Sequence, residues 1–168
     1  VKPVKHSPPK APHGWGKSWI DAFAESYFQK ANLKPAIDAE PVTLLRRLHF
    51  DLTGLPPEPA IVDSFTSKPS SDAYSKIVDD LLDSPHYGEH MAAYWLDLVR
   101  FADTVGYHGD QTHNISPYRD WVIDAFNDDL PFDQFTREQL AGDLLPNATT
   151  DQLVATGYNR LLQTSHEG

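Results

Sequence analysis

The side chains best suited to bind a metal or move a proton gather in one polar segment, residues 103–120. They comprise carboxylates, imidazoles, a phenol and a guanidinium, namely Asp103, Tyr107, His108, Asp110, His113, Arg119 and Asp120. Carboxylate with imidazole suits Zn, Fe or Mn, and carboxylate with carbonyl oxygen suits Ca. Steps of five, two and three residues separate Asp103, His108, Asp110 and His113. These steps match neither the H-E-x-x-H helix nor the EF-hand loop, so the pattern is one of composition rather than a metal-binding signature.

For a divalent metal, Ca or Zn, we predict Asp103 and Asp110 as ligands, with His166 and Glu167 from the C-terminal end of the chain. The second pair can contribute only if the last helix returns to the polar segment. His108 and His113 are secondary candidates, because a single histidine in a loop is usually solvated. Asp103 also has a plainer interpretation, an Asx turn leading out of the preceding helix, and we rank that interpretation first.

The catalytic candidates are Asp103, Tyr107, Asp110, Arg119 and Asp120. Arg119 would lie in the first turn of a helix, where the helix dipole disfavours a cation. It is therefore a candidate to bind an anion or to pair with Asp103 or Asp110. A buried Arg–Asp network joining two helices explains the same residues without catalysis, and we favour it. The chain has no G-x-S-x-G elbow, P-loop or dinucleotide glycine pattern, so the question of enzyme activity stays open.

Helical periodicity surrounds this segment on both sides, and no stretch shows the alternation of a strand. Pro41, Ser84-Pro85 and Ser116-Pro117 are signals for helix starts. Gly54, followed by two prolines, is a helix stop. We predict an all-α fold: a single compact domain of about eight short-to-medium helices over residues 17–168. Residues 1–16 carry four prolines and three lysines, which predicts an extended Pro-rich linker or arm.

Two helices carry aromatic stripes that we expect to face the core. In the first, from Ser18 to about Leu33, the stripe contains Ile20, Phe23, Ala24, Tyr27 and Ala31. In the long central helix, which follows Ser84-Pro85, it contains Tyr87, Met91, Tyr94, Trp95, Leu98 and Ala102. Such stripes at helical spacing are typical of core packing rather than of a cofactor site.

Composition excludes several classes of function. The 168 residues carry a formal net charge of −10, which argues against nucleic acid and anionic membrane as partners and is compatible with a cationic partner or a bound metal. The chain has no cysteine, which rules out disulfides, thiolate metal sites and covalently attached haem within it. No apolar run approaches the roughly 20 residues of a membrane helix, so we expect no membrane insertion.

Four stretches together resemble one known family: LLRRLHFDLTGLPPEP, YSKIVDDLLDSPHYGEHMAAYWLDLVRFADTVGY, PYRDWVIDAFNDDLPFDQFTREQLAGDLLP and TGYNRLLQTSHEG. They are similar to a domain of unknown function found in cytochrome-c-like proteins of planctomycetes and related bacteria, the second of their cytochrome-associated domains. The likeness runs from about Ile20 to Gly168. It includes Asp103, Gly106, Tyr107, Asp110, Pro117, Tyr118, Arg119, Asp120 and the terminal His166-Glu167-Gly168, whereas His108 and His113 occupy positions that vary in the family.

The resemblance implies a large exported, periplasmic bacterial protein from which this chain is a piece, with a haem-c domain often preceding it. It supplies no established catalytic residues. Three hypotheses follow. The first is a helical module that docks against neighbouring domains or supports electron transfer, with no covalent haem of its own. The second is a metal-dependent, polysaccharide-active enzyme with its site at residues 103–120. The third is a carbohydrate-binding module, which needs two or more exposed aromatic side chains on one face.

Overall fold

A computed structural model describes residues 18–104 and 111–161 of the chain. These residues form eight α-helices and two short 3₁₀ helices, and their sole β-type pairing is an isolated bridge between Thr104 and Thr112. The all-α prediction is therefore confirmed for the described part. The predicted Pro-rich arm, residues 1–16, lies outside it.

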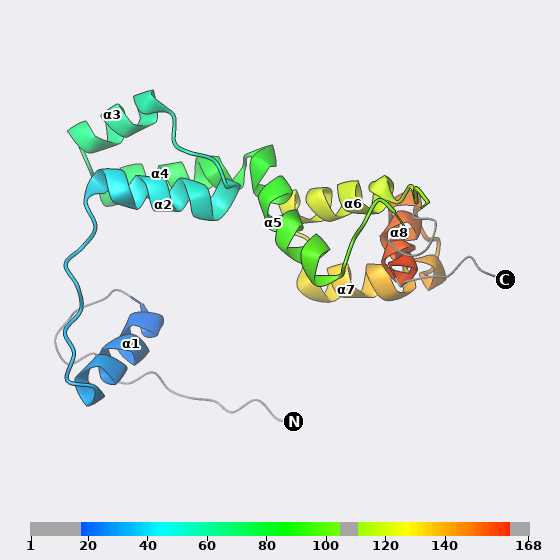
Figure 1. The fold of residues 1–168 in the computed structure, drawn as a ribbon, viewed down its shortest axis with the longest axis horizontal. Coiled ribbons are helices and arrows are strands. Elements are labelled where there is room, and N and C mark those ends of the chain that lie inside the picture. The colour runs from blue at the N-terminus through cyan, green and yellow to red at the C-terminus, as the bar shows by residue number, and fades with distance from the viewer. Residues whose placement is uncertain (1–17, 105–110, 162–168) are drawn as a thin grey trace. The chain divides into compact units, whose positions relative to one another are not determined.

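The helices belong to two compact units, residues 1–39 and residues 40–168. The first unit contains α1 (Trp19–Lys30). The second contains all the other elements, which Figure 1 labels: α2 (Pro41–Thr53), α3 (Pro59–Ser67), α4 (Ser71–Leu82), α5 (Pro85–Leu98), α6 (Ser116–Asn127), α7 (Phe132–Ala141), η1 (Gly142–Leu144), α8 (Thr150–Ala155) and η2 (Thr156–Arg160). None of the described helices is long and apolar enough to cross a lipid bilayer.

Helix α1 begins with a capping box and exposes its aromatic side chains. The Ser18 hydroxyl accepts a hydrogen bond from the Asp21 backbone N–H, and the Asp21 carboxylate accepts one from the Ser18 N–H. The predicted inward stripe is wrong here: Ile20, Phe23 and Tyr27 are exposed, whereas Ala22 and Glu25 are buried. Periodicity identifies an apolar stripe, but it does not identify what covers it.

Helix α2 has the ends predicted from its prolines and glycine. Pro41 is its first residue, and Gly54 follows it in the left-handed conformation with φ 69°. The Gly54 N–H donates to the Phe50 carbonyl at 3.1 Å, which closes the last turn. Leu45 and Leu48 are buried as expected. Helices α3 and α4 pack against this helix, and Ser70 caps α4 by accepting from the Ala73 N–H.

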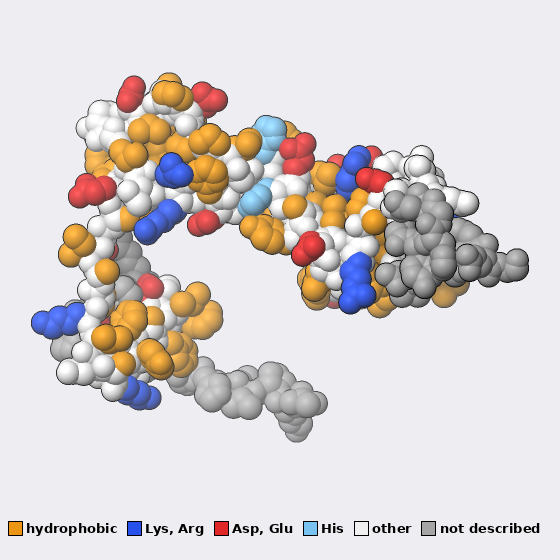
Figure 2. Space-filling model, in the orientation of Figure 1, with side chains coloured by type: hydrophobic (Ala, Val, Ile, Leu, Met, Phe, Trp, Pro, Cys, Tyr) orange, Lys and Arg blue, Asp and Glu red, His pale blue; other side chains and the backbone are white. Residues whose placement is uncertain are grey.

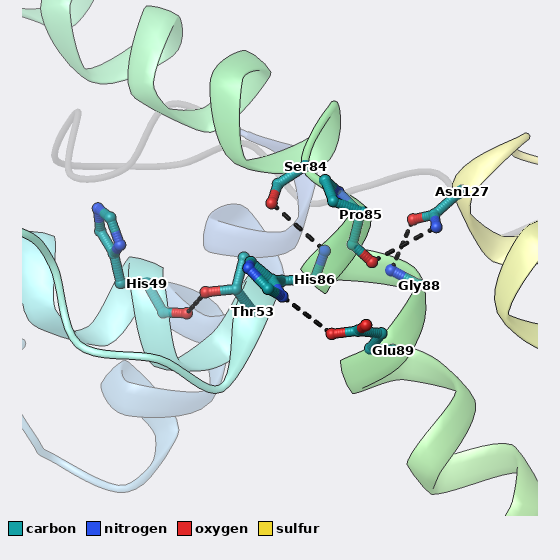
Figure 3. A network of polar contacts seen from close by, with 8 residues as sticks. All are labelled: His49, Thr53, Ser84, Pro85, His86, Gly88, Glu89 and Asn127. Atoms are coloured by element: carbon teal, nitrogen blue, oxygen red, sulfur yellow. Dashed lines mark hydrogen bonds and ion pairs between the residues drawn. The ribbon is translucent and has the colours of Figure 1, made fainter.

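Helix α5 connects α2 and α4 to α6, and it touches all three. At its start the Gly88 N–H donates to Asn127 Oδ1 at 2.7 Å, and Asn127 Nδ2 donates to the Pro85 carbonyl at 3.4 Å (Figure 3). A Cβ at Gly88 would collide with the backbone oxygen of Ile123. The glycine therefore permits α5 and α6 to approach closely.

The buried face of α5 differs from the predicted face. Gly88 and Ala92 are its buried residues, whereas Tyr94 is 65% exposed and Leu98 71% exposed. The contact with α6 selects the small side chains, because they allow the closest approach of two helices. Tyr94 and Leu98, which belong to the predicted stripe, therefore face solvent.

The core of the second unit lies among α5, α6, α7 and α8. Its buried members are Ala92, Tyr118, Trp121, Val122, Ala125, Phe135 and Ala155. The ring of Phe135 contacts two indoles, edge-on to Trp95 at a centroid distance of 5.0 Å and stacked on Trp121 at 5.2 Å. Burying one such aromatic side chain contributes about 2–3 kcal/mol, so this cluster is the main source of stability for these helices.

Candidate functional site

Within the polar segment, the described residues on the two sides of positions 105–110 are joined by backbone contacts. The His113 N–H donates to the Asp103 carbonyl at 2.7 Å, and Thr104 forms an antiparallel bridge with Thr112. Asp103 follows α5, and His113 precedes α6. Tyr107, His108 and Asp110 lie between them, outside the described residues, as do His166 and Glu167.

Arg119 pairs with its neighbour in sequence. Its Nε and Nη2 both donate to Asp120 Oδ1, at 3.0 and 2.8 Å. The hydrogen bond and charge of Asp120, with a smaller contribution from the charge of Asp103, raise the pKa of Arg119. The two side chains are 44% and 59% exposed, so this pair is not buried, and the predicted pairing of Arg119 with Asp110 lies outside the described residues. An exposed pair of this kind adds little stability, and the Arg119 guanidinium is accessible at the surface.

The last described helix returns to the polar segment, as a site including the C-terminal residues would require. Arg160 in η2 places Nη2 2.9 Å from His113 Nε2. Because a guanidinium only donates hydrogen bonds, His113 Nε2 accepts here. That nitrogen is therefore occupied by Arg160, which weakens His113 further as a metal ligand.

Sequence analysis missed a buried polar network beside this segment. The Tyr118 hydroxyl donates to Gln139 Oε1 at 2.6 Å. Trp95 Nε1 donates both to the Tyr118 hydroxyl oxygen and to Gln139 Oε1, each at 3.1 Å. Gln139 Nε2 donates in turn to the Phe135 carbonyl. Tyr118 is 1% exposed and Gln139 2% exposed. The available signal was Gln139 itself, a polar residue four positions after Phe135 on the apolar side of its helix.

This network holds Tyr118 protonated. Burial raises the pKa of Tyr118 to about 12, and the hydrogen bond from Trp95 opposes this only in part. A phenol with that pKa is not a general base at neutral pH. Each of its polar groups has a partner, so the network's chemical role is to align α5, α6 and α7 rather than to react.

Within residues 18–104 and 111–161, no three His, Asp or Glu side chains come close enough to hold a metal ion. The predicted ligands Asp110, His166 and Glu167 fall outside these ranges. The Asp103–Asp110 metal site and the catalytic roles of Tyr107 and Asp110 therefore stay predictions.

Comparison with known proteins identifies the family. Residues 19–168 match the family model PSCyt2, described as "Protein of unknown function (DUF1549)". The chain belongs to the PSCyt2 family. The match includes α1 as well as the whole polar segment and its flanking helices. No curated protein and no solved structure matches this PSCyt2 chain.

Proposed function

We propose that this PSCyt2 chain is a non-catalytic docking module of an exported bacterial cytochrome-c-associated protein, with a haem-c domain as its partner and no covalent haem of its own. The observation that carries the proposal is the exposed row on α5. Tyr94 and Leu98 are one helical turn apart and are 65% and 71% exposed. On the preceding turn the half-buried His90 ring packs edge-on against Tyr94 at 5.2 Å.

Large apolar side chains that lie next to one another on a surface mark interaction sites more often than isolated ones do. Helix α5 contacts α2, α4 and α6, and Tyr94 and Leu98 stay exposed among the described residues, so this pair can receive a further domain. The net charge of −10 favours a partner with a basic surface around its apolar contact. The haem-c domain as the partner follows from the family architecture.

The aromatic cluster supports docking rather than an electron relay through Tyr118. A tyrosine that gives up an electron must also release its proton to a base. The Tyr118 hydroxyl donates to the amide oxygen of Gln139, and an amide is a very weak base. Oxidation of Tyr118 is therefore unfavourable where it lies.

Calorimetric titration of the chain with a haem-c domain from a protein of this architecture tests the proposal. We expect Tyr94→Asp and Leu98→Asp to weaken binding at least about tenfold, equivalent to about 1.4 kcal/mol. Leu153→Asp on α8, where the leucine is also exposed, is the matched control and should bind like the parent chain. If the parent does not bind, or if the control loses as much affinity as the α5 variants, the docking proposal is wrong.

A second candidate function, carbohydrate binding, is favoured by α1. Trp19 and Tyr27 are 66% and 70% exposed, and Phe23 lies between them at 40%. Spacing of four residues places these rings about 6 Å apart along one side of a helix, and Figure 2 shows hydrophobic side chains gathered over α1. This satisfies the requirement for exposed aromatic side chains on one face. Sedimentation with insoluble polysaccharides tests it, and binding should be lost in Trp19→Ala and Tyr27→Ala but not in Leu33→Ala.

A further inference from the structure

Helix α1 turns a carboxylate inward and its largest apolar side chains outward. Glu25 is 3% exposed, whereas Trp19 and Tyr27 expose most of their surface. An amphipathic helix ordinarily buries its apolar stripe and leaves its charges in water. Among the described residues, moreover, the buried Glu25 Oε2 has no hydrogen-bond donor. The outward side of α1 therefore has the composition of a contact surface rather than of a solvated face.

The outward side chains form a row along the helix, which we call the α1 row. Trp19, Phe23 and Tyr27 are four residues apart, and the Trp19 and Phe23 rings meet edge to face with centroids 6.3 Å apart. Ile20, which is also exposed, flanks them. Lys30 is exposed and lies eleven residues after Trp19, a spacing that continues the same side of a helix. The α1 row thus has an indole at one end and a cation at the other.

Local hydrogen bonds hold the α1 row in place without help from a partner. The capping box described above closes the start of the helix. At its end, Asn32 has a left-handed φ of 54° and donates its N–H to the Gln29 carbonyl at 3.1 Å. The Leu33 N–H donates to the Phe28 carbonyl at 2.8 Å, which completes a Schellman motif. Because the helix is already formed, a partner that packs on it does not have to order it first.

The area of the α1 row is sufficient for a weak dimer. A fully exposed aromatic side chain offers about 150–250 Å². At the exposed fractions of the four apolar side chains of the row, roughly 500 Å² is left uncovered. A symmetric contact uses this area on both copies and buries about 1,000 Å² in total, which is the lower limit for a specific interface. We therefore expect a dissociation constant on the order of 100 μM.

The charge pattern favours a second copy of the chain as the occupant. The net charge of −10 makes two copies repel in general, but no carboxylate belongs to the α1 row. Asp21 is two residues from both Trp19 and Phe23 and so lies on another side of the helix, and Glu25 is buried. When two copies of α1 lie antiparallel, Lys30 of each comes beside the Trp19 ring of the other, and a cation over an indole is attracted to it. The two ends of the row are therefore complementary to each other.

We propose that the chain forms a two-fold symmetric dimer through α1, with the two helices antiparallel and Phe23 of each copy at the symmetry axis. Ile20 of one copy then meets Tyr27 of the other. The contact uses the same surface on both copies, so it closes after two copies and does not grow into a filament. The dimer does not rest on docking through α5. It covers the rings that a polysaccharide would use, so these two occupants of α1 exclude each other.

Sedimentation equilibrium of the purified chain, from about 5 μM to about 1 mM, tests the dimer. We expect a monomer–dimer equilibrium that tightens as salt is added, because salt screens the repulsion between two acidic chains. Phe23→Glu, which places two carboxylates at the symmetry axis, should weaken the dimer at least tenfold. Gln29→Glu adds the same charge to α1 outside the row and is the matched control, which should dimerise like the parent. Circular dichroism should establish that both variants keep the helix content of the parent.

Single cysteines test the antiparallel orientation, because the chain has no cysteine of its own. An oxidised equimolar mixture of the Ile20→Cys and Tyr27→Cys variants should yield mainly the disulfide between the two different chains. A parent chain that stays monomeric at the highest concentration would overturn the proposal, whether or not it binds polysaccharide. Equal affinity in Phe23→Glu and Gln29→Glu would overturn it as well, as would disulfides that form mainly between identical variants.

Discussion

Arg160 and His113 are 47 residues apart in the chain, and their side chains meet at 2.9 Å. The contact joins η2, the last described helix, to the base of the polar segment, where His113 is also bonded to the Asp103 carbonyl. The sequence alone left open whether the end of the chain returns to the polar segment. The Arg160–His113 contact shows that η2 does return to it. The partner is an arginine that was not among the predicted site residues.

Removing this contact should loosen the polar segment without unfolding the chain. Both side chains are at least partly exposed, so Arg160→Ala should lower the free energy of unfolding by less than about 1 kcal/mol. Amide hydrogen exchange at Thr104 and Thr112 should nevertheless accelerate, because η2 no longer restrains the segment. Arg137→Ala, which removes an exposed pair on α7, is the control and should leave exchange at these two residues unchanged.

Gly88→Ala should destabilise the protein, although alanine favours helices more than glycine by about 1 kcal/mol. The added Cβ would collide with the Ile123 backbone oxygen and crowd Asn127, so the helices must separate. We expect a net loss of about 1–3 kcal/mol, measured by urea unfolding. Ala93→Gly, at an exposed position on the same helix, should lose only about 1 kcal/mol. A stability gain in Gly88→Ala would show that α5 and α6 are not as close as described.

Tyr118→Phe should change the response to alkaline pH. The folded state keeps the Tyr118 proton until the pKa of about 12, whereas the unfolded chain releases it near 10. Between these values the folded state binds more protons, so the free energy of unfolding falls as pH rises, by about 2–3 kcal/mol in all. Tyr118→Phe should lose about 1–2 kcal/mol at neutral pH, because a hydrogen bond disappears, but it should show a shallower decline from pH 10 to 12. Urea unfolding at pH 8, 10 and 11.5 measures both effects.

Because His49 is buried, we expect the protein to lose stability at acid pH. Its side chain is 5% exposed, and among the described groups its buried Nε2 has no hydrogen-bond partner. Burial lowers the pKa of His49 below its ordinary value of 6.5, so stability present above pH 6.5 is lost as pH falls toward the folded-state pKa. His49→Gln should therefore lose less of its own stability than the parent does as pH falls below 6.5, measured by urea unfolding. His86→Gln is the control, since His86 is an exposed surface residue paired with Glu89 (Figure 3), and the acid response should remain in it.

Helix boundaries were largely predictable, because the signals for them are local. Ser84 caps α5 and Pro41 is the first residue of α2, as predicted, and Gly54 ends α2. Each needs only a few neighbouring residues to form. The start of α6 differs slightly: Ile115 is its cap, and Ser116 is already helical.

The choice of buried face was less predictable, because it depends on partners far away in sequence. On α5, Gly88 and Ala92 face α6 because their small size allows close approach, and the larger Tyr94 and Leu98 are left exposed. Gln139 was overlooked for the same reason, since its hydrogen-bond partners Tyr118 and Trp95 are 21 and 44 residues away. The hollow lined by Asp124, Glu138 and Val154 likewise combines α6, α7 and α8, which periodicity within one helix cannot reveal.

The predicted metal site at Asp103 and Asp110 can be tested by elemental analysis and chelation. If the polar segment is a structural connection, as the Asp103–His113 and His113–Arg160 contacts suggest, chelator should leave the melting temperature unchanged. The double variant Asp103→Ala, Asp110→Ala should then be at most slightly less stable and should contain the same metal as the parent. Asp79→Ala with Asp83→Ala controls for the loss of two negative charges. A stoichiometric metal in the parent that vanishes only in the Asp103/Asp110 variant would establish the metal site and favour a metal-dependent enzyme over the docking module.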